Sequence, residues 1–255
     1  MSQEESIKSP EEVSRFSEEE KYCLRKFLLN LKSGYDLVNR FCSKIEQMIK
    51  ASNVKIGDNP NFSIALHCVL SLMSTNNGLF LLSHGYMGDF EAVHKRVVEF
   101  FLRAIYFREF PDEERKWREN KEKTIDRKSM AEKLDERNQE HRIFSTDYKH
   151  FFSKFIHEVV YKTTNEWAHG DFEMMYRELA RELDTQSYPS KFSMGPRFDQ
   201  NNMKIMLKSL LHSCILQVLF LADTFKYPQH YYHDLVIQAK KHLLENEIEK
   251  LDKSN

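Results

Sequence analysis

Glycine and proline are scarce in this chain: seven glycines and six prolines make up thirteen of its 255 residues, about 5%. Average usage of these two residues is roughly 12%. Folds built from strands, such as sandwiches, barrels and propellers, need a turn every few residues and therefore many turn formers. The sequence thus predicts an all-α fold, a multi-helix bundle, and 255 residues are enough for one domain with a sizeable core.

Apolar residues recur at spacings of three and four along most of the chain, a period that only a helix satisfies. The clearest run is Leu24, Phe27, Leu28, Leu31, Tyr35, Val38, Phe41, Ile45, Met48 and Ile49. Ser9 and Pro10 predict a short first helix, and Ser17 with Glu20 predicts a separate start for the long one. Further helices are expected at about 61–84, 89–110, 145–168, 201–225 and 231–250.

The segment 108–142 differs from the rest because it holds 11 basic and 11 acidic residues and few apolar ones. Intermingled charges at helical spacing predict solvated helices or a mobile insertion without a sustained core stripe. The domain organisation expected from this pattern is a polar N-terminal segment, 1–16, followed by a single all-helical domain, 17–253, that carries the charged helical insertion 108–142.

Charge and cysteine usage limit the function classes. The net charge is −1, so the overall balance attracts neither nucleic acid nor acidic lipid. The N-terminal residues lack an apolar stretch, and residues 206–225 are interrupted by Lys208, His212, Gln217 and Asp223, so neither a secretory signal nor a membrane span is expected. The four cysteines form no CxxC pair and lie among apolar residues, which favours free thiols and a cytoplasmic location.

The common catalytic and cofactor motifs are missing from the sequence. It contains no GxGxxG, no GxxxxGK, no HExxH and no GxSxG. The first two cradle dinucleotides and phosphates, and the last two mark zinc proteases and serine hydrolases. We therefore expect no cofactor and no metal site.

Two polar strips are the candidate functional features. The first follows the otherwise apolar helix 90–110, where Arg96, Glu99 and Arg103 share one face. Glu99 precedes Arg103 by four residues, the favourable order for an ion pair. One interpretation is a structural pair that faces solvent, and the other is a carboxylate and a guanidinium that face a site.

The second strip lies on the helix expected at 145–168, where Glu158, Tyr161, Lys162, Asn165 and His169 cluster on one side. It is either the solvent face of an amphipathic helix or part of a site. An imidazole at the end of a helix is suited to general acid–base work near neutral pH. Metal binding by His169 would need two or three more ligands than the pattern offers.

These strips resemble a family of all-helical bacterial proteins without an assigned activity. That family carries Arg-x-x-Glu on an apolar helix and Tyr-x-x-x-Ser-Glu-x-x-His at the end of a later helix. Here the elements run from Arg96 to Glu99 and from Tyr161 to His169, with Asn165 in the place of the serine. The resemblance spans about residues 85–170 and implies an all-helical fold.

The chain is also distantly similar to HEPN-type helical ribonucleases, which carry Arg-x4–6-His, often with Asn after the Arg. Asn165 and His169 match that register, but Thr164 stands where the arginine would be. The nearest cation is Lys162, and a lysine replaces the bidentate guanidinium poorly. This departure argues against a standard HEPN ribonuclease.

Three functions remain open on the sequence alone. The first is a binding or interaction module with a polar pocket between two central helices and an unknown protein or small molecule as partner. The second is a hydrolase, of divergent HEPN-like ribonuclease type, in which Arg96, Glu99 and His169 act together. RNA as a partner is not supported by the charge balance. A homo-oligomer that uses the first and last helices is a third reading.

Overall fold

The computed structural model describes residues 10–57, 60–120, 126–141, 151–156 and 196–252, and within these ranges it contains helices and no strand. The prediction of an all-α bundle is therefore confirmed. The elements in chain order are α1 (Pro10–Ala51), α2 (Asn61–Ser83), α3 (Met87–Glu109), α4 (Pro111–Asn120), α5 (Arg127–His141), α6 (Phe151–Ile156), α9 (Gln200–Thr224), the 3₁₀ turn η2 (Gln229–Tyr231) and α10 (His233–Asp252).

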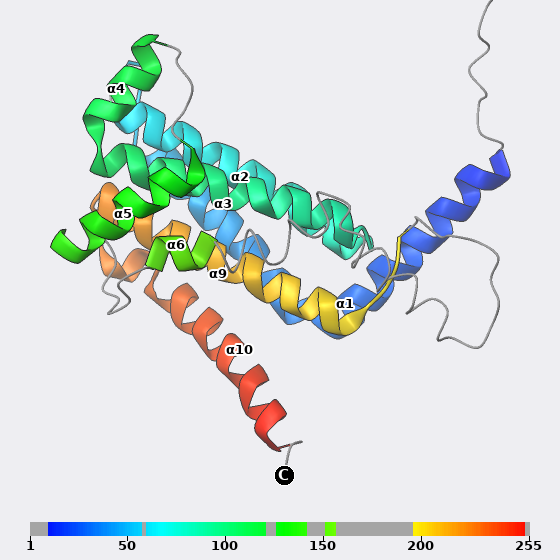
Figure 1. Cartoon of the computed structure of the whole chain (residues 1–255). Helices are drawn as coiled ribbons and strands as arrows, with labels where there is room; N and C mark the ends of the chain where they lie inside the picture. Colours follow the sequence, from blue (N-terminus) through cyan, green and yellow to red (C-terminus); the bar gives the residue numbers. More distant parts are fainter. Residues whose placement is uncertain (1–9, 58–59, 121–125, 142–150, 157–195, 253–255) are drawn as a thin grey trace, which may run out of the picture.

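The helices α1, α2, α3 and α9 form an elongated bundle, with α4, α5 and α6 near one end and α10 projecting from it (Figure 1). The helices α2 and α3 are consecutive and pack side by side after a tight reversal at Gly85. This residue has φ +92°, and a Cβ there would lie 2.7 Å from the backbone nitrogen of Arg197. Glycine is therefore required where the chain before α9 crosses the α2–α3 turn.

The core is a continuous apolar cluster to which every one of these helices except α4 contributes. Its largest fully buried side chains are Phe27, Phe41, Ile45 and Met48 of α1, Ile64 and Leu82 of α2, Phe90, Ile105 and Tyr106 of α3, Met130 of α5, Phe152 of α6 and Phe220 of α9. All four cysteines are buried and free, as their apolar surroundings predicted.

The start of the bundle differs from the sequence prediction. A single helix runs from Pro10 to Ala51, so the expectation of a separate helix start at Ser17 is wrong. The irregularity lies instead at Leu31, whose φ of −127° and ψ of 17° are not helical. Leu31 is nevertheless buried in the core, and Ser33 and Gly34, a pair of the kind at which helices bend, follow within one turn.

The expectation that residues 108–142 lack a core stripe is wrong for α5. Met130, Ala131 and Leu134 are all buried in the main core. The carboxylate of Asp135 is also buried and accepts hydrogen bonds from the backbone N–H groups of Phe152 (2.7 Å) and Ser153 (3.0 Å). It thereby caps the start of α6, so this charged segment is joined to the core by both apolar and polar contacts.

Two helices of the described chain, α2 and α9, are long and apolar enough to cross a membrane by length and composition. The prediction that residues 206–225 fall short of a span is therefore wrong by that criterion. More than half of the apolar stretch is buried within the structure in each helix, as in the core helices of soluble proteins.

Candidate functional site

The first polar strip predicted from the sequence lies on α3. Arg96 is exposed, whereas Glu99 and Arg103 are partly buried and form an ion pair with 3.0 Å between Arg103 Nη2 and Glu99 Oε1. The pair expected from the spacing is thus present. The members of the second strip, Glu158, Tyr161, Lys162, Asn165 and His169, lie outside the described residues, so a pocket formed jointly by the two strips stays a prediction.

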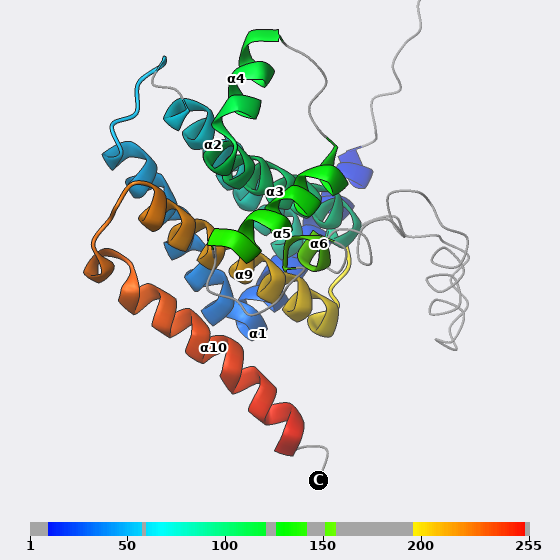
Figure 2. The ribbon, with the colours of Figure 1, turned by 60° about the vertical axis from the view of Figure 1, so that its left-hand side comes forward.

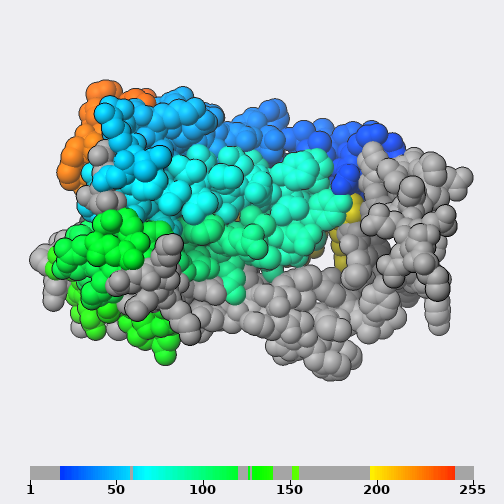
Figure 3. All heavy atoms as spheres, turned by 90° about the horizontal axis from the view of Figure 1, so that it is seen from above, coloured from blue at the N-terminus to red at the C-terminus, as the bar shows by residue number. Residues whose placement is uncertain are grey.

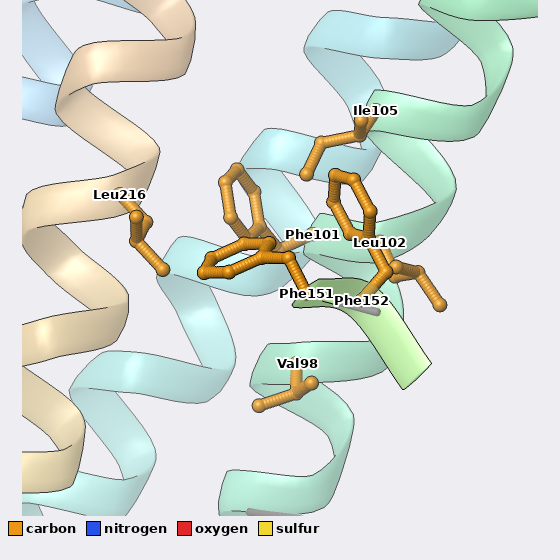
Figure 4. Close-up of a pocket in the computed structure, with 7 residues that line it drawn as sticks. All are labelled: Val98, Phe101, Leu102, Ile105, Phe151, Phe152 and Leu216. Atoms are coloured by element: carbon orange, nitrogen blue, oxygen red, sulfur yellow. The ribbon is translucent and has the colours of Figure 1, made fainter. Parts of the chain in front are cut away.

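A small apolar pocket lies between α3, α6 and α9 (Figure 4). It is lined by Val98, Phe101, Leu102, Ile105, Phe151, Phe152 and Leu216, and its free volume is about 10 Å³. That volume holds at most one water molecule, and the lining offers a water no polar side chain. The pocket is therefore a packing gap of the core and not a ligand site.

A buried polar cluster joins α4 to the α2–α3 pair. Ser63 Oγ donates a hydrogen bond to Glu114 Oε1 at 2.5 Å, and Arg118 Nε donates to the same oxygen at 3.2 Å. His67 Nδ1 is 2.8 Å from the carbonyl oxygen of Ser63, and its ring is in edge contact with Phe107 and Trp117.

The electrostatics of this cluster favour a neutral imidazole. Burial lowers the pKa of His67 below its usual value, the positive charge of Arg103 lowers it further, and Glu114 and the Ser63 carbonyl oppose the shift. A base held in its neutral form is a common catalytic device. Here, however, the Glu114 carboxylate already accepts hydrogen bonds from Arg118 within α4 and from Ser63 of α2, and the bond from Ser63 attaches α4 to the bundle.

The open polar hollow is a groove between α1 and the segment η2–α10, which run beside each other in Figure 2. Its volume is about 440 Å³. We call it the α1–α10 groove, and its lining comprises Asn39, Arg40, Ser43, Lys44 and Gln47 of α1 with His230, Tyr231, Tyr232, Asp234 and Leu235 of the opposite wall. Small-molecule sites commonly have volumes of this size.

Tyr231, in the wall opposite α1, is held by a stacked neighbour outside the lining, Tyr227. The rings of Tyr227 and Tyr231 stack with centroids 5.4 Å apart, and the Tyr227 hydroxyl donates to the carbonyl oxygen of Met48 at 2.5 Å. Burial and the adjacent Tyr231 raise the pKa of Tyr227. Lys44 Nζ lies 4.1 Å from the centre of the Tyr231 ring, so a cation–π contact holds this ammonium group in the groove.

The two cations of the groove differ from their neighbours on α1. Lys32 and Lys50 pair with Asp36 (2.7 Å) and Glu46 (2.6 Å), the carboxylates one turn away. Arg40 Nη1 instead donates to the amide oxygen of Gln238 at 2.7 Å, and neither Arg40 nor Lys44 has an ion-pair partner within the described ranges.

The charges that line the groove are Arg40, Lys44 and Asp234, and its formal net charge is +1 with His230 neutral. The cations are four residues apart on one helix, where like charges repel each other by about 0.2–0.5 kcal/mol. A bound anion would remove that repulsion. The first turn of α10 also borders the groove, and the positive end of its helix dipole adds to the positive potential that favours a bound anion.

Arg40, Lys44 and Tyr231 do not stand out in the sequence as candidate site residues. The sequence indicates this site only through Arg40 and Lys44, two cations four residues apart whose nearest carboxylates, Asp36 and Glu46, pair with other lysines. The signal is weak, because it depends on knowing that Asp36 and Glu46 are already engaged. Among the described residues no group of three or more His, Cys, Asp or Glu side chains could hold a metal ion.

Comparison of the chain with family models, with curated proteins and with solved structures finds no match. The function is therefore argued from the site.

Proposed function

We propose that this protein is a binding protein that holds a small anionic molecule in the α1–α10 groove. The observation that carries the proposal is the pair of cations, Arg40 and Lys44, which are oriented by Gln238 and Tyr231 and form no ion pair within the described residues. The groove volume of about 440 Å³ suits a small molecule, since such sites usually span roughly 300–1,000 Å³.

The groups around the cations suit a carboxylate or a phosphate. Lys44 offers three N–H donors and Arg40 offers five in a planar fork. Asn39, Ser43 and Gln47 add neutral donors on the same wall, and Asp234 repels any part of an anion that reaches it. The ring of Tyr231 orients the ammonium group before a ligand arrives, which reduces the entropy that binding must overcome.

The state of the cysteines bears on where in the cell the protein is located. We propose a cytoplasmic location, supported by four free and buried cysteines, because such thiols persist in a reducing compartment.

The test is calorimetric titration with inorganic phosphate, citrate and adenosine monophosphate as probes. At least one probe should bind the natural chain, and Lys44→Gln or Arg40→Gln should weaken that binding about tenfold or more, because each removes one charge-assisted hydrogen bond. The matched control is Lys50→Gln, which removes the same charge from an exposed lysine already paired with Glu46. Equal affinities in all four proteins would refute the groove as the site.

The hydrolase reading is a second proposal and uses different residues. Its support is Arg96, whose exposed guanidinium lies one turn from the Glu99–Arg103 pair, together with the HEPN-like placement of His169 in the sequence. Incubation of the purified chain with mixed RNA, beside His169→Ala, tests it. Cleavage that disappears in the variant supports a divergent ribonuclease, and equal or absent cleavage in both proteins ends the proposal.

A further inference from the structure

The two walls of the α1–α10 groove are joined at two places. At one end of the molecule the turn between α9 and α10 packs against the later part of α1, orange beside blue in Figure 3, and the Tyr227 hydroxyl donates to the carbonyl oxygen of Met48. Further along, Arg40 of α1 donates to Gln238 of α10 at 2.7 Å. These bonds set the distance between the walls, so the charged side chains between them are held in an arrangement that a ligand can match.

Asp234 is the one acidic side chain among the described residues that line the groove. It lies in the first turn of α10. Tyr231 precedes it in the lining and contacts Lys44, and Gln238, one helical turn after it on the same face, accepts from Arg40. Along this wall the carboxylate therefore lies between the contact of one cation and the contact of the other.

The carboxylate of Asp234 is nevertheless not paired with these cations. Within the described residues it forms no ion pair with Arg40 or Lys44, each of which has a neutral partner instead. The groove between them has a volume of about 440 Å³. It thus keeps two positive charges on α1 apart from one negative charge on α10.

An aspartate in the first turn of a helix also has a role that needs no ligand, because its charge is favourable at the positive end of the helix dipole. Asp89 has this position in α3 and is likewise exposed, but it does not line the groove. The two aspartates share the effect on the helix, and only Asp234 borders the same groove as Arg40 and Lys44. They therefore form a matched pair for experiment.

We propose, on the premise that the groove is the binding site, that its ligand is a small molecule with two negative charges and one ammonium group. The negative charges lie beside Arg40 and Lys44, and the ammonium group donates to the carboxylate of Asp234. Such a ligand has a net charge of −1, which is opposite to the net charge of the groove lining. A molecule with the negative charges alone leaves Asp234 without a partner and is repelled by it.

Two chemical classes have this charge pattern. The phosphate monoester of an amino alcohol carries nearly two negative charges at pH 7.5, because the second pKa of such a phosphate is about 6. A dicarboxylic amino acid divides the same charge between two carboxylates. The planar fork of Arg40 binds either acidic group with two hydrogen bonds, and the ammonium group of Lys44 adds a point charge.

Calorimetric titration at pH 7.5 with two matched pairs of probes tests the proposal. Phosphoethanolamine is compared with ethyl phosphate, and glutamate with glutarate, so the members of each pair differ only by the ammonium group. In at least one pair the molecule with the ammonium group should bind about tenfold tighter or more, because it gains a charge-assisted hydrogen bond to Asp234. The pair that shows the gain identifies the acidic group of the ligand.

Substitution of Asp234 assigns the gain to this carboxylate. Asp234→Asn should weaken binding of the ammonium-bearing probe about tenfold, and ethyl phosphate or glutarate should bind as well as before or better, because the repulsion is gone. Asp89→Asn is the matched control and should leave the preference for the ammonium group intact. Circular dichroism of both variants shows whether the helices are retained.

Two outcomes would overturn the proposal, and they differ in what they leave standing. If probes bind in a way that depends on Arg40 and Lys44, but the ammonium group gives no gain or Asp234→Asn preserves the gain, the ligand is a simple anion and the groove remains the site. If none of these probes binds, and neither do phosphate, citrate or adenosine monophosphate, the groove itself is refuted together with this proposal.

Discussion

The helices α2 and α9 are both long and apolar, yet they differ in the side chains that they bury and expose. On α9 the buried face holds large residues such as Leu210, Val218 and Phe220, and the exposed positions include His212 and Asp223. On α2 the buried face is rich in small residues and the outward face is apolar. The comparison teaches that overall hydropathy does not say which side of a helix is inside.

The difference has an energetic consequence. The contribution of α9 to the free energy of unfolding should depend on the size of its buried side chains, because large side chains remove more apolar surface from water. The contribution of α2 should depend on its close approach to α3, so a larger side chain at that contact should lower the free energy of unfolding. Two substitutions distinguish these two modes, and a third tests the pH dependence of the contact between α3 and α9.

The largest effect is expected on the buried face of α9. Phe220 is 1% exposed, its ring meets that of Phe101 edge-on at 5.6 Å, and Arg108 lies over its face. Phe220→Ala should lower the free energy of unfolding by about 3–5 kcal/mol, because it removes these contacts and leaves a cavity. Urea denaturation measures the change. Ile205→Ala, at a position of α9 that is 57% exposed, is the control and should cost far less.

A pH effect is expected at the contact between α3 and α9. His94 is buried, stacks on Phe90, and has its Nε2 3.4 Å from Ser213 Oγ of α9. Burial lowers its pKa from 6.5 to about 4. Between these pH values the unfolded chain binds the proton and the folded chain does not, so the free energy of unfolding falls as the pH decreases.

The expected loss between pH 6.5 and 4 is about 3 kcal/mol, the linkage equivalent of that pKa shift. Urea denaturation at a series of pH values measures it. His94→Gln removes the titrating group and should flatten this part of the curve relative to the natural chain. If the two pH dependences are identical, His94 does not titrate as its burial implies.

The smallest effect distinguishes the two faces of α2 with one added side chain. Gly78→Leu places a leucine against the Phe90 ring and should destabilise the fold by about 1–3 kcal/mol through overpacking. Asn77→Leu adds the same side chain one residue earlier, on the exposed face, and should change stability by less than about 0.5 kcal/mol. Thermal unfolding of both variants gives the comparison, and equal destabilisation would contradict the assignment of the faces.

Much of the fold was predictable from the sequence. The expected helices at 61–84, 201–225 and 231–250 match α2, α9 and α10 to within two residues at each end. These predictions succeeded because Gly85 and Pro228 stop helices locally and because the apolar period is read within a few turns. The long-range packing of α5 was missed, since Met130, Ala131 and Leu134 are too few to stand out among 22 charged neighbours.

The candidate site was less predictable. The Glu99–Arg103 pair followed from its spacing within one helix and is present. The α1–α10 groove could not be read in the same way, because its contacts join residues remote in sequence. Arg40 and Gln238 are 198 positions apart, and Lys44 meets Tyr231 across a similar separation. No pattern among neighbouring residues in the sequence indicates such a contact.

The sequence by itself determined that this chain forms helices and where most of them begin and end, because helical periodicity, caps and turn residues act over a few neighbouring positions. Only the tertiary structure decided which face of α2 lies inside. Both faces of that helix are uncharged, so charge does not decide its orientation, and close packing against α3 selects the face with the small residues.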